Sequence, residues 1–161
     1  MRPIRVFAGL VGFVVIASTR SVAGATIIYV DDDASPGGNG LSWPTAFRFL
    51  QDALAAAQPS DEIRVAQGTY YPDRDAAHPT GTADRALSFT LKDGVGLYGS
   101  YAGLGATDPN ARDIAAYVTV LSGDIGAPGD DSDNSYHVVH GGSTSASALL
   151  DGFTITDGNA N

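Results

Sequence analysis

The sequence predicts a mainly β fold that opens a β-solenoid, in which short strands are wound into stacked coils. In residues 149–161, Phe153 and Ile155 alternate with Thr154 and Thr156, and an Asp-Gly pair lies on either side of them. After residue 58 every apolar run is short and bounded by Gly, Asp, Asn or Pro. One coil cannot bury its own apolar face, so these residues are expected to be the first coils of a longer stack.

The first element of the chain is a predicted signal peptide, residues 1–25. Arg2 and Arg5 give it a positive start, residues 6–17 form an apolar run too short to span a bilayer, and Ala-Gly-Ala at 23–25 is a small-residue cleavage site. The sequence therefore predicts a protein that is secreted or displayed at the cell surface. No membrane insertion is expected after cleavage.

Charge limits the class of partner. The chain has nine basic and eighteen acidic residues, a net charge of −9, and the leader contains three of the arginines and no acid. An acidic surface repels phosphate backbones, so nucleic acid is excluded as a partner and polysaccharide remains. The chain has no cysteine, so its stability depends on burial and hydrogen bonds without disulfides.

The mature chain begins with a β-rich run, residues 26–30, followed by a Gly- and Pro-rich loop. Residues 44–58 are predicted to form a helix. Pro44 suits its first turn, while Phe47, Leu50, Leu54 and Ala57 recur at helical spacing before Pro59 ends it.

Short strands are predicted for the rest of the chain, at 62–66, 87–91, 95–98, 118–121, 136–139 and 148–150. Two long polar segments, 70–85 and 123–135, interrupt them. Loops of this length in a compact domain are usually functional or disordered.

Several short motifs occur in order along residues 26–161: Ile-Tyr-Val-Asp at 28–31, Leu-Gln-Asp-Ala-Leu at 50–54, Ile-Arg-Val-Ala-Gln-Gly-Thr-Tyr at 63–70, Leu-Ser-Gly-Asp-Ile at 121–125 and Leu-Asp-Gly-Phe-Thr-Ile at 150–155. Together they resemble the N-terminal portion of secreted bacterial right-handed parallel β-helix proteins of the pectate-lyase-like superfamily. The resemblance implies the start of a right-handed parallel β-helix (solenoid) with one N-terminal capping α-helix at residues 44–58.

The same resemblance implies that residues 26–161 are the N-terminal cap and first coils of a longer protein. Active sites in the superfamily tend to lie on central coils, and no lyase motif is matched here residue by residue. The segment is therefore expected to be non-catalytic as it stands.

A cluster of aspartates predicts a calcium site. Asp124, Asp130, Asp131 and Asp133 lie with Asn134 on a glycine-containing loop. Hard oxygen ligands on a bendable loop are what Ca²⁺ requires. The alternative is that these are turn residues on a solvated loop, where aspartates are common.

Aromatic residues beside loops predict a carbohydrate-binding surface. Tyr71 and Tyr101 are the candidates, because aromatic faces pack well on sugar rings. Trp43 and Tyr98 are assigned to packing instead.

These observations favour a structural or carbohydrate-binding role. The alternatives are the N-terminal part of a polysaccharide lyase or glycoside hydrolase, and a calcium-stabilised adhesin-like protein. Leu150, Phe153 and Ile155 would present an apolar edge, which predicts self-association.

Overall fold

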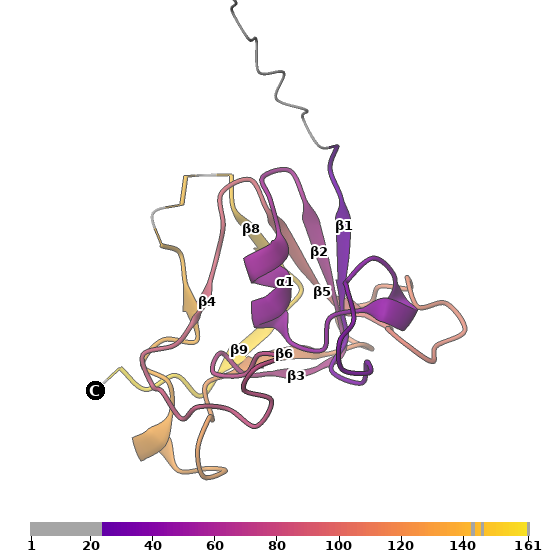
Figure 1. Ribbon diagram of the computed structural model, residues 1–161. Helices are drawn as coiled ribbons and strands as arrows, with labels where there is room; N and C mark the ends of the chain where they lie inside the picture. Colours follow the sequence, from indigo (N-terminus) through magenta and orange to yellow (C-terminus); the bar gives the residue numbers. More distant parts are fainter. Residues whose placement is uncertain (1–23, 143, 146, 161) are drawn as a thin grey trace, which may run out of the picture.

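The computed structural model describes residues 24–142, 144–145 and 147–160, in which short strands form three sheets (Figure 1). The first sheet has the order β1 (Ile27–Val30), β2 (Glu62–Ala66), β5 (Gly96–Tyr101) and β8 (Leu149–Asp151). The second has the order β3 (Gly68–Tyr70), β6 (Thr119–Ser122) and β9 (Thr154–Thr156), and the third pairs β4 (Phe89–Thr90) with β7 (Val139–His140). Neighbouring strands are parallel in all three sheets.

The predicted right-handed parallel β-helix is wrong. The described residues form three small sheets of four, three and two strands together with one α-helix, a mixed α/β arrangement without a regular solenoid. The connections explain the difference, because they range from the single residue Gln67, between β2 and β3, to the segment 71–88, between β3 and β4. A stack of coils needs a repeat of nearly constant length, and these connections do not provide one.

Along each strand of the first sheet, alternate side chains point to one face, and those on the inner face form the core. Ile28, Ile63 and Leu97 are neighbours across β1, β2 and β5, and all three side chains are buried. Parallel register continues this row to the partly buried Leu150 on β8. Aligned branched and apolar side chains of this kind stabilise a sheet by packing against their cross-strand neighbours.

The helix is shorter than predicted. Residues 43–45 form a 3₁₀ turn, η1 (Trp43–Thr45), the chain then runs extended, and α1 spans only Leu50–Ala56. Phe47 is the reason, because its N–H donates to the Tyr29 carbonyl and its carbonyl accepts from Asp31 N–H, both at 2.9 Å. A residue paired with β1 in this way cannot also belong to an α-helix.

The helix therefore does not cap an open edge as the resemblance implied. It packs against β1, β2 and β4, and Figure 1 shows it in front of the first sheet. Leu50, Ala53 and Leu54 form its buried side. The edge of β1 is instead covered by the extended segment around Phe47.

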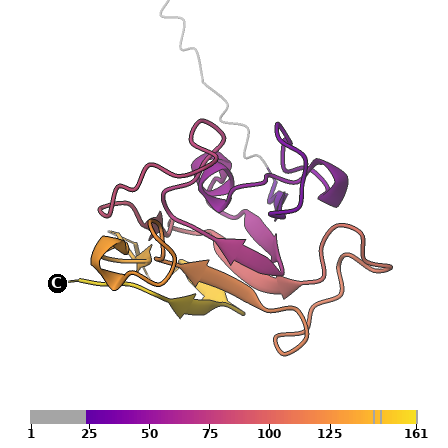
Figure 2. The same ribbon diagram turned by 90° about the horizontal axis from the view of Figure 1, so that it is seen from below.

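The second sheet leaves the first at a junction (Figure 2) where Ser100 and Thr119 are buried. Ser100, near the end of β5, has a left-handed backbone with φ 67° and is 1% exposed. Its N–H donates to Thr119 Oγ1 at 2.8 Å, and this hydroxyl donates in turn to the Ala66 carbonyl at 3.0 Å. The Thr119 hydroxyl thus satisfies backbone groups that no strand partner reaches.

Replacing Thr119 with valine tests this junction. Valine keeps the shape but leaves the buried Ser100 N–H without an acceptor, so we expect the free energy of unfolding to fall by about 1–3 kcal/mol. Urea denaturation of both proteins measures the change. Thr154→Val, on the exposed side of β9, is the matched control and should shift stability by less than about 0.5 kcal/mol. Equal losses in both variants would contradict the role of the hydroxyl.

Candidate functional site

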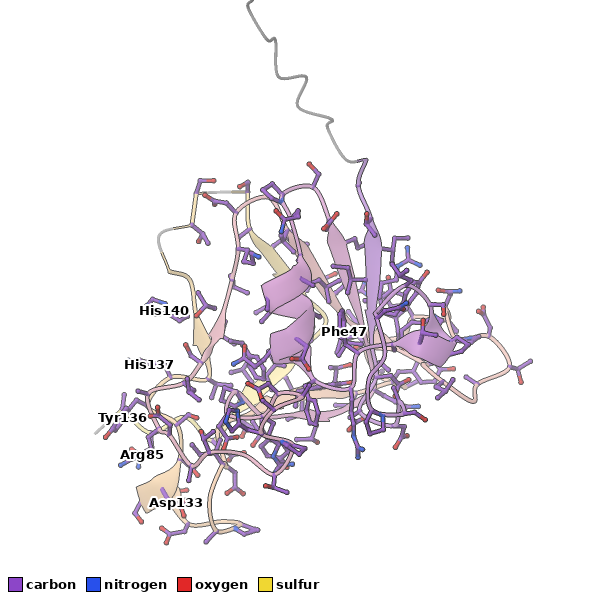
Figure 3. The ribbon with its side chains drawn as sticks, in the orientation of Figure 1. Phe47, Arg85, Asp133, Tyr136, His137 and His140 are labelled. Atoms are coloured by element: carbon purple, nitrogen blue, oxygen red, sulfur yellow. The ribbon has the colours of Figure 1, made fainter. Side chains whose placement is uncertain are left out.

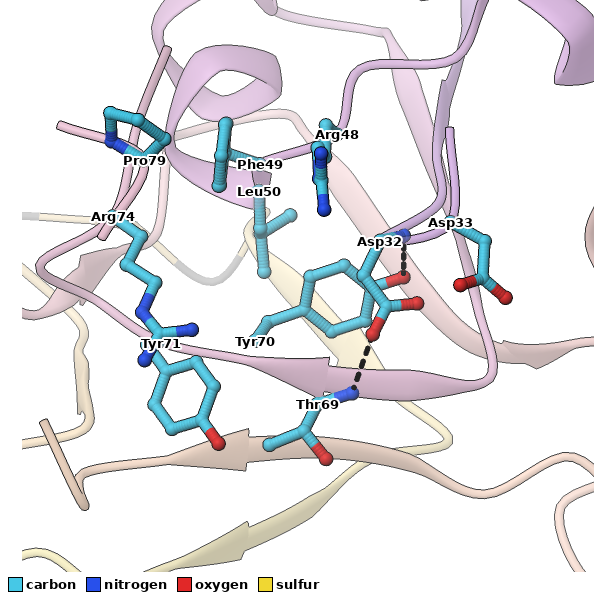
Figure 4. Close-up of a pocket in the computed structure, with 10 residues that line it drawn as sticks. All are labelled: Asp32, Asp33, Arg48, Phe49, Leu50, Thr69, Tyr70, Tyr71, Arg74 and Pro79. Carbon is cyan, nitrogen blue, oxygen red and sulfur yellow. Dashed lines mark hydrogen bonds between the residues drawn. The ribbon is translucent and has the colours of Figure 1, made fainter. Parts of the chain in front are cut away.

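An open cavity of about 360 Å³ lies where the end of β1 approaches β3 and the start of α1 (Figure 4). Its lining combines acidic, basic, aromatic and aliphatic side chains. They are Asp32, Asp33, Arg48, Phe49, Leu50, Thr69, Tyr70, Tyr71, Arg74 and Pro79.

The acidic wall is held by hydrogen bonds between β1 and β3. Asp32 Oδ2 accepts from Thr69 N–H at 3.2 Å, and Asp32 N–H donates to the Tyr70 hydroxyl at 3.2 Å. Gly68 makes this approach feasible, because a Cβ atom there would collide with the Asp32 carboxylate. Asp32 is therefore fixed in position, and Asp33 beside it is exposed.

Burial changes the pKa values of the titratable groups on this wall. Desolvation raises the pKa of Asp32, opposed by the hydrogen bond from Thr69 N–H and reinforced by the negative charges of Asp33 and Asp31. Desolvation likewise raises the pKa of Tyr70 far above its usual range. Tyr70 therefore remains a neutral phenol, and its hydroxyl donates to the Ala66 carbonyl at 3.2 Å.

The opposite wall comes from the loop after β3. The Arg74 guanidinium lies over the Tyr71 ring, 3.9 Å from the ring centre, and Figure 4 shows this pair across the cavity from Asp32 and Asp33. An arginine stacked on an aromatic face can still donate from the edge of the guanidinium plane. For Arg74 this concerns the terminal N–H groups, because Nε is closed to solvent.

The loop that carries Arg74 and Tyr71 is ordered by partly buried polar contacts. Gln51 Nε2, on α1, donates to the carbonyl of Ser88 at 3.2 Å. The Asp73 carboxylate accepts from the N–H groups of Thr82 and Ala83 at 2.9 and 3.0 Å. This long polar segment is therefore a structured wall of the cavity.

Asp31, Asp32 and Asp33 are also the one carboxylate triplet in the described part of the chain whose oxygens lie within 4.8 Å of one another. Asp31 Oδ1 accepts from Asp33 N–H at 3.0 Å and its Oδ2 from Leu104 N–H at 2.6 Å. Asp32 is engaged with Thr69 as described above. Their hydrogen bonds explain the cluster as a turn, so it is weak evidence for a metal.

The two tyrosines proposed for sugar binding have different surroundings. Tyr71 lines the cavity, whereas Tyr101 is 7% exposed and its ring lies 5.9 Å from that of Trp43. The guanidinium groups of Arg64 and Arg112 lie 5.4 and 5.8 Å from the centre of the Tyr101 ring. Tyr101 therefore has no free face for a sugar, and the structure leaves Tyr71 as the aromatic candidate.

The four loop aspartates predicted to bind calcium lie apart from this cavity in sequence and do not line it. Asp130 accepts from Ser132 N–H at 2.9 Å and precedes η2 (Asp131–Asp133), and Asp131 is exposed. Asp124 and Asp133 turn toward their own loop, and Figure 3 shows Asp133 at η2, of which it is the last residue. Within the described residues these four do not form a close carboxylate triplet.

Sequence reasoning missed Asp32, Arg48 and Arg74. The only local signal was the run of three aspartates directly after a predicted strand, a position where loops often carry function.

Comparison of the chain with protein-family models, with curated proteins and with solved structures finds no match to any of them. The resemblance to pectate-lyase-like proteins therefore stays a prediction from motifs. Among the described residues, no helix has the length and apolar character needed to cross a membrane. The predicted signal peptide lies outside these residues except for Gly24 and Ala25.

The raised pKa of Asp32 predicts a pH-dependent stability. Because the folded protein holds the Asp32 proton more tightly than the unfolded chain, the stabilisation is present below the ordinary aspartate pKa and is lost as pH rises through the folded value. Asp32→Asn keeps an acceptor for Thr69 but carries no charge. The free energy of unfolding of Asp32→Asn, relative to that of the parent, should therefore increase from about pH 3 to pH 7.

Urea denaturation across that range measures the difference between the two proteins. Asp108→Asn, at an exposed loop position, is the control for loss of one negative charge. If the free energies of unfolding of the parent and of Asp32→Asn differ by the same amount at every pH, burial of the Asp32 carboxylate is not the cause of the difference.

Proposed function

We propose that the protein binds a carbohydrate in the cavity between Asp32 and Tyr71, as a non-catalytic, structural or carbohydrate-binding segment of a secreted or cell-surface protein. The observation that carries the proposal is the composition of this one cavity. Carboxylates lie on one wall, and a guanidinium stacked on an aromatic ring lies on the other.

Sugar hydroxyls suit such a lining. Each hydroxyl both donates and accepts, so it can donate to the carboxylates of Asp32 and Asp33 and accept from the guanidinium groups of Arg48 and Arg74. Phe49 and the part of the Tyr71 ring that Arg74 leaves uncovered supply apolar surface for the C–H side of a pyranose. The cavity volume of about 360 Å³ is within the range of small-molecule sites.

Charge favours a neutral sugar. Two carboxylates and two guanidinium groups line the cavity, so its local charge is balanced, while the chain as a whole carries −9. A polyanionic polysaccharide would gain little in the cavity and would be repelled by the rest of the surface.

Hydrolysis is less well supported by this geometry. Glycoside hydrolases place carboxyl groups on both sides of the scissile bond, whereas Asp32 and Asp33 are adjacent residues on one wall. Binding without turnover therefore fits the cavity better.

The proposal is tested with a glycan array followed by titration of the best neutral oligosaccharide. Tyr71→Ala removes the aromatic surface and should weaken binding by about 3-fold to 10-fold, the range expected for one aromatic contact. Tyr136→Ala is the matched control, because Tyr136 also carries an arginine over its ring, Arg85 at 4.4 Å, but does not line this cavity (Figure 3). Its affinity should equal that of the parent.

Two results would overturn the proposal. One is a parent protein that retains no glycan on the array. The other is a Tyr71→Ala variant, with an unchanged thermal midpoint, that binds as tightly as the parent.

A further inference from the structure

The loop from Gly123 to Ser135 encloses two carboxylates. Asp124 Oδ2 accepts from Gly129 N–H at 3.0 Å, and Asp133 Oδ2 accepts from Ala127 N–H at 2.7 Å. The two acidic side chains approach the same short stretch of backbone from opposite ends of the loop. Each of them uses one oxygen for this purpose.

The other oxygens are buried without a donor. Within the described residues, Asp124 Oδ1, Asp133 Oδ1 and Asn134 Oδ1 have no hydrogen-bond partner and are closed to solvent. The Ser135 hydroxyl is in the same condition. Asn134 is 2% exposed and Ser135 is fully buried. Asp124 and Asp133 are partly buried residues whose Oδ1 atoms are closed to solvent.

Backbone contacts bring the two ends of the loop together. Ser135 N–H donates to the Gly123 carbonyl at 2.8 Å, which places Asp124 and Asn134 on either side of one hydrogen bond. Asn159 fastens the closure, because its N–H donates to the Ser135 carbonyl at 2.8 Å and its amide donates to the Asp131 carbonyl at 2.6 Å. The acceptors are therefore held in place before any ligand arrives.

Unpaired buried acceptors destabilise the folded protein, and charged ones do so most. Three such acceptors lie on this one loop, and two of them are carboxylate oxygens. A cation that binds several oxygen ligands at once would satisfy all three. Hard divalent cations have this property, and Ca²⁺ tolerates a mixture of carboxylate, amide and hydroxyl oxygens in flexible geometry.

We propose that this loop binds one Ca²⁺ ion through Asp124, Asp133 and Asn134, with the Ser135 hydroxyl as a further oxygen and the remaining positions filled by water or backbone carbonyls. Asp130 and Asp131, two of the four aspartates that the sequence suggested, lie outside this set. Asp130 is used as the cap of η2, and Asp131 is exposed. The site shares no residue with the proposed sugar cavity, so the two proposals stand or fall separately.

The test is calorimetric titration of the chelator-treated protein with CaCl₂, together with thermal unfolding in CaCl₂ and in EDTA. We expect one binding event and a higher unfolding midpoint with calcium, because a ligand that binds only the folded state stabilises it. Asp133→Asn should lower the calcium affinity by at least about 10-fold, which corresponds to 1.4 kcal/mol. Asp131→Asn, in the same loop, should bind calcium as the parent does.

If Asp133→Asn fails to fold, Asp124→Asn serves for the same measurement. A parent protein without heat of binding and without a shift of the midpoint would overturn the proposal. Equal weakening in Asp131→Asn would also overturn it, since that result means general attraction to an acidic surface. Loss of calcium binding in Asp33→Asn would place the ion at the aspartates after β1 instead.

Discussion

The carbonyl group of Ala66 is the point on which the arrangement of the sheets depends. It lies at the end of β2 and accepts two hydroxyl groups, those of Thr119 and Tyr70. After Ala66 the chain leaves the first sheet and enters the second with only Gln67 between them. A strand cannot turn so sharply inside a core unless side chains satisfy the freed backbone groups, and these two hydroxyls do so.

The hydrogen bonds around the Ala66 carbonyl also shape the cavity. Tyr70 binds Ala66 and also accepts the N–H of Asp32, so the end of β1 is tied to the beginning of the second sheet. Thr69 and Tyr71, on either side of Tyr70, are then placed on the cavity lining. The candidate site is therefore a consequence of how the chain turns between two sheets.

Much of the strand pattern could be predicted from the sequence, because alternation of apolar residues is local information. β2 has the predicted bounds 62–66, and β1 differs from its prediction by one residue. β3 was missed, since Gly68-Thr69-Tyr70 is too short to show an alternation. The helix was predicted too long, because Phe47 has helical spacing in the sequence but is paired with β1 in the fold.

The fold class and most of the site depend on contacts between distant segments. Strand propensity indicates where strands occur, but the unequal connections decide how many sheets they form and whether coils repeat. Arg48 and Arg74 reach the cavity from segments that nothing in the sequence connects to Asp32. Tyr101 looked exposed beside its loop, and only the packing of Trp43 against it shows that it is buried.

Trp43 is an intrinsic fluorescence probe of the fold. It is the single tryptophan of the chain, is 5% exposed, and lies 4.9 Å from the Tyr29 ring and 5.9 Å from the Tyr101 ring. These tyrosines belong to β1 and β5, on either side of β2 in the first sheet. The fluorescence of one indole therefore reports whether strands from both halves of that sheet are assembled, without any label being added to the protein.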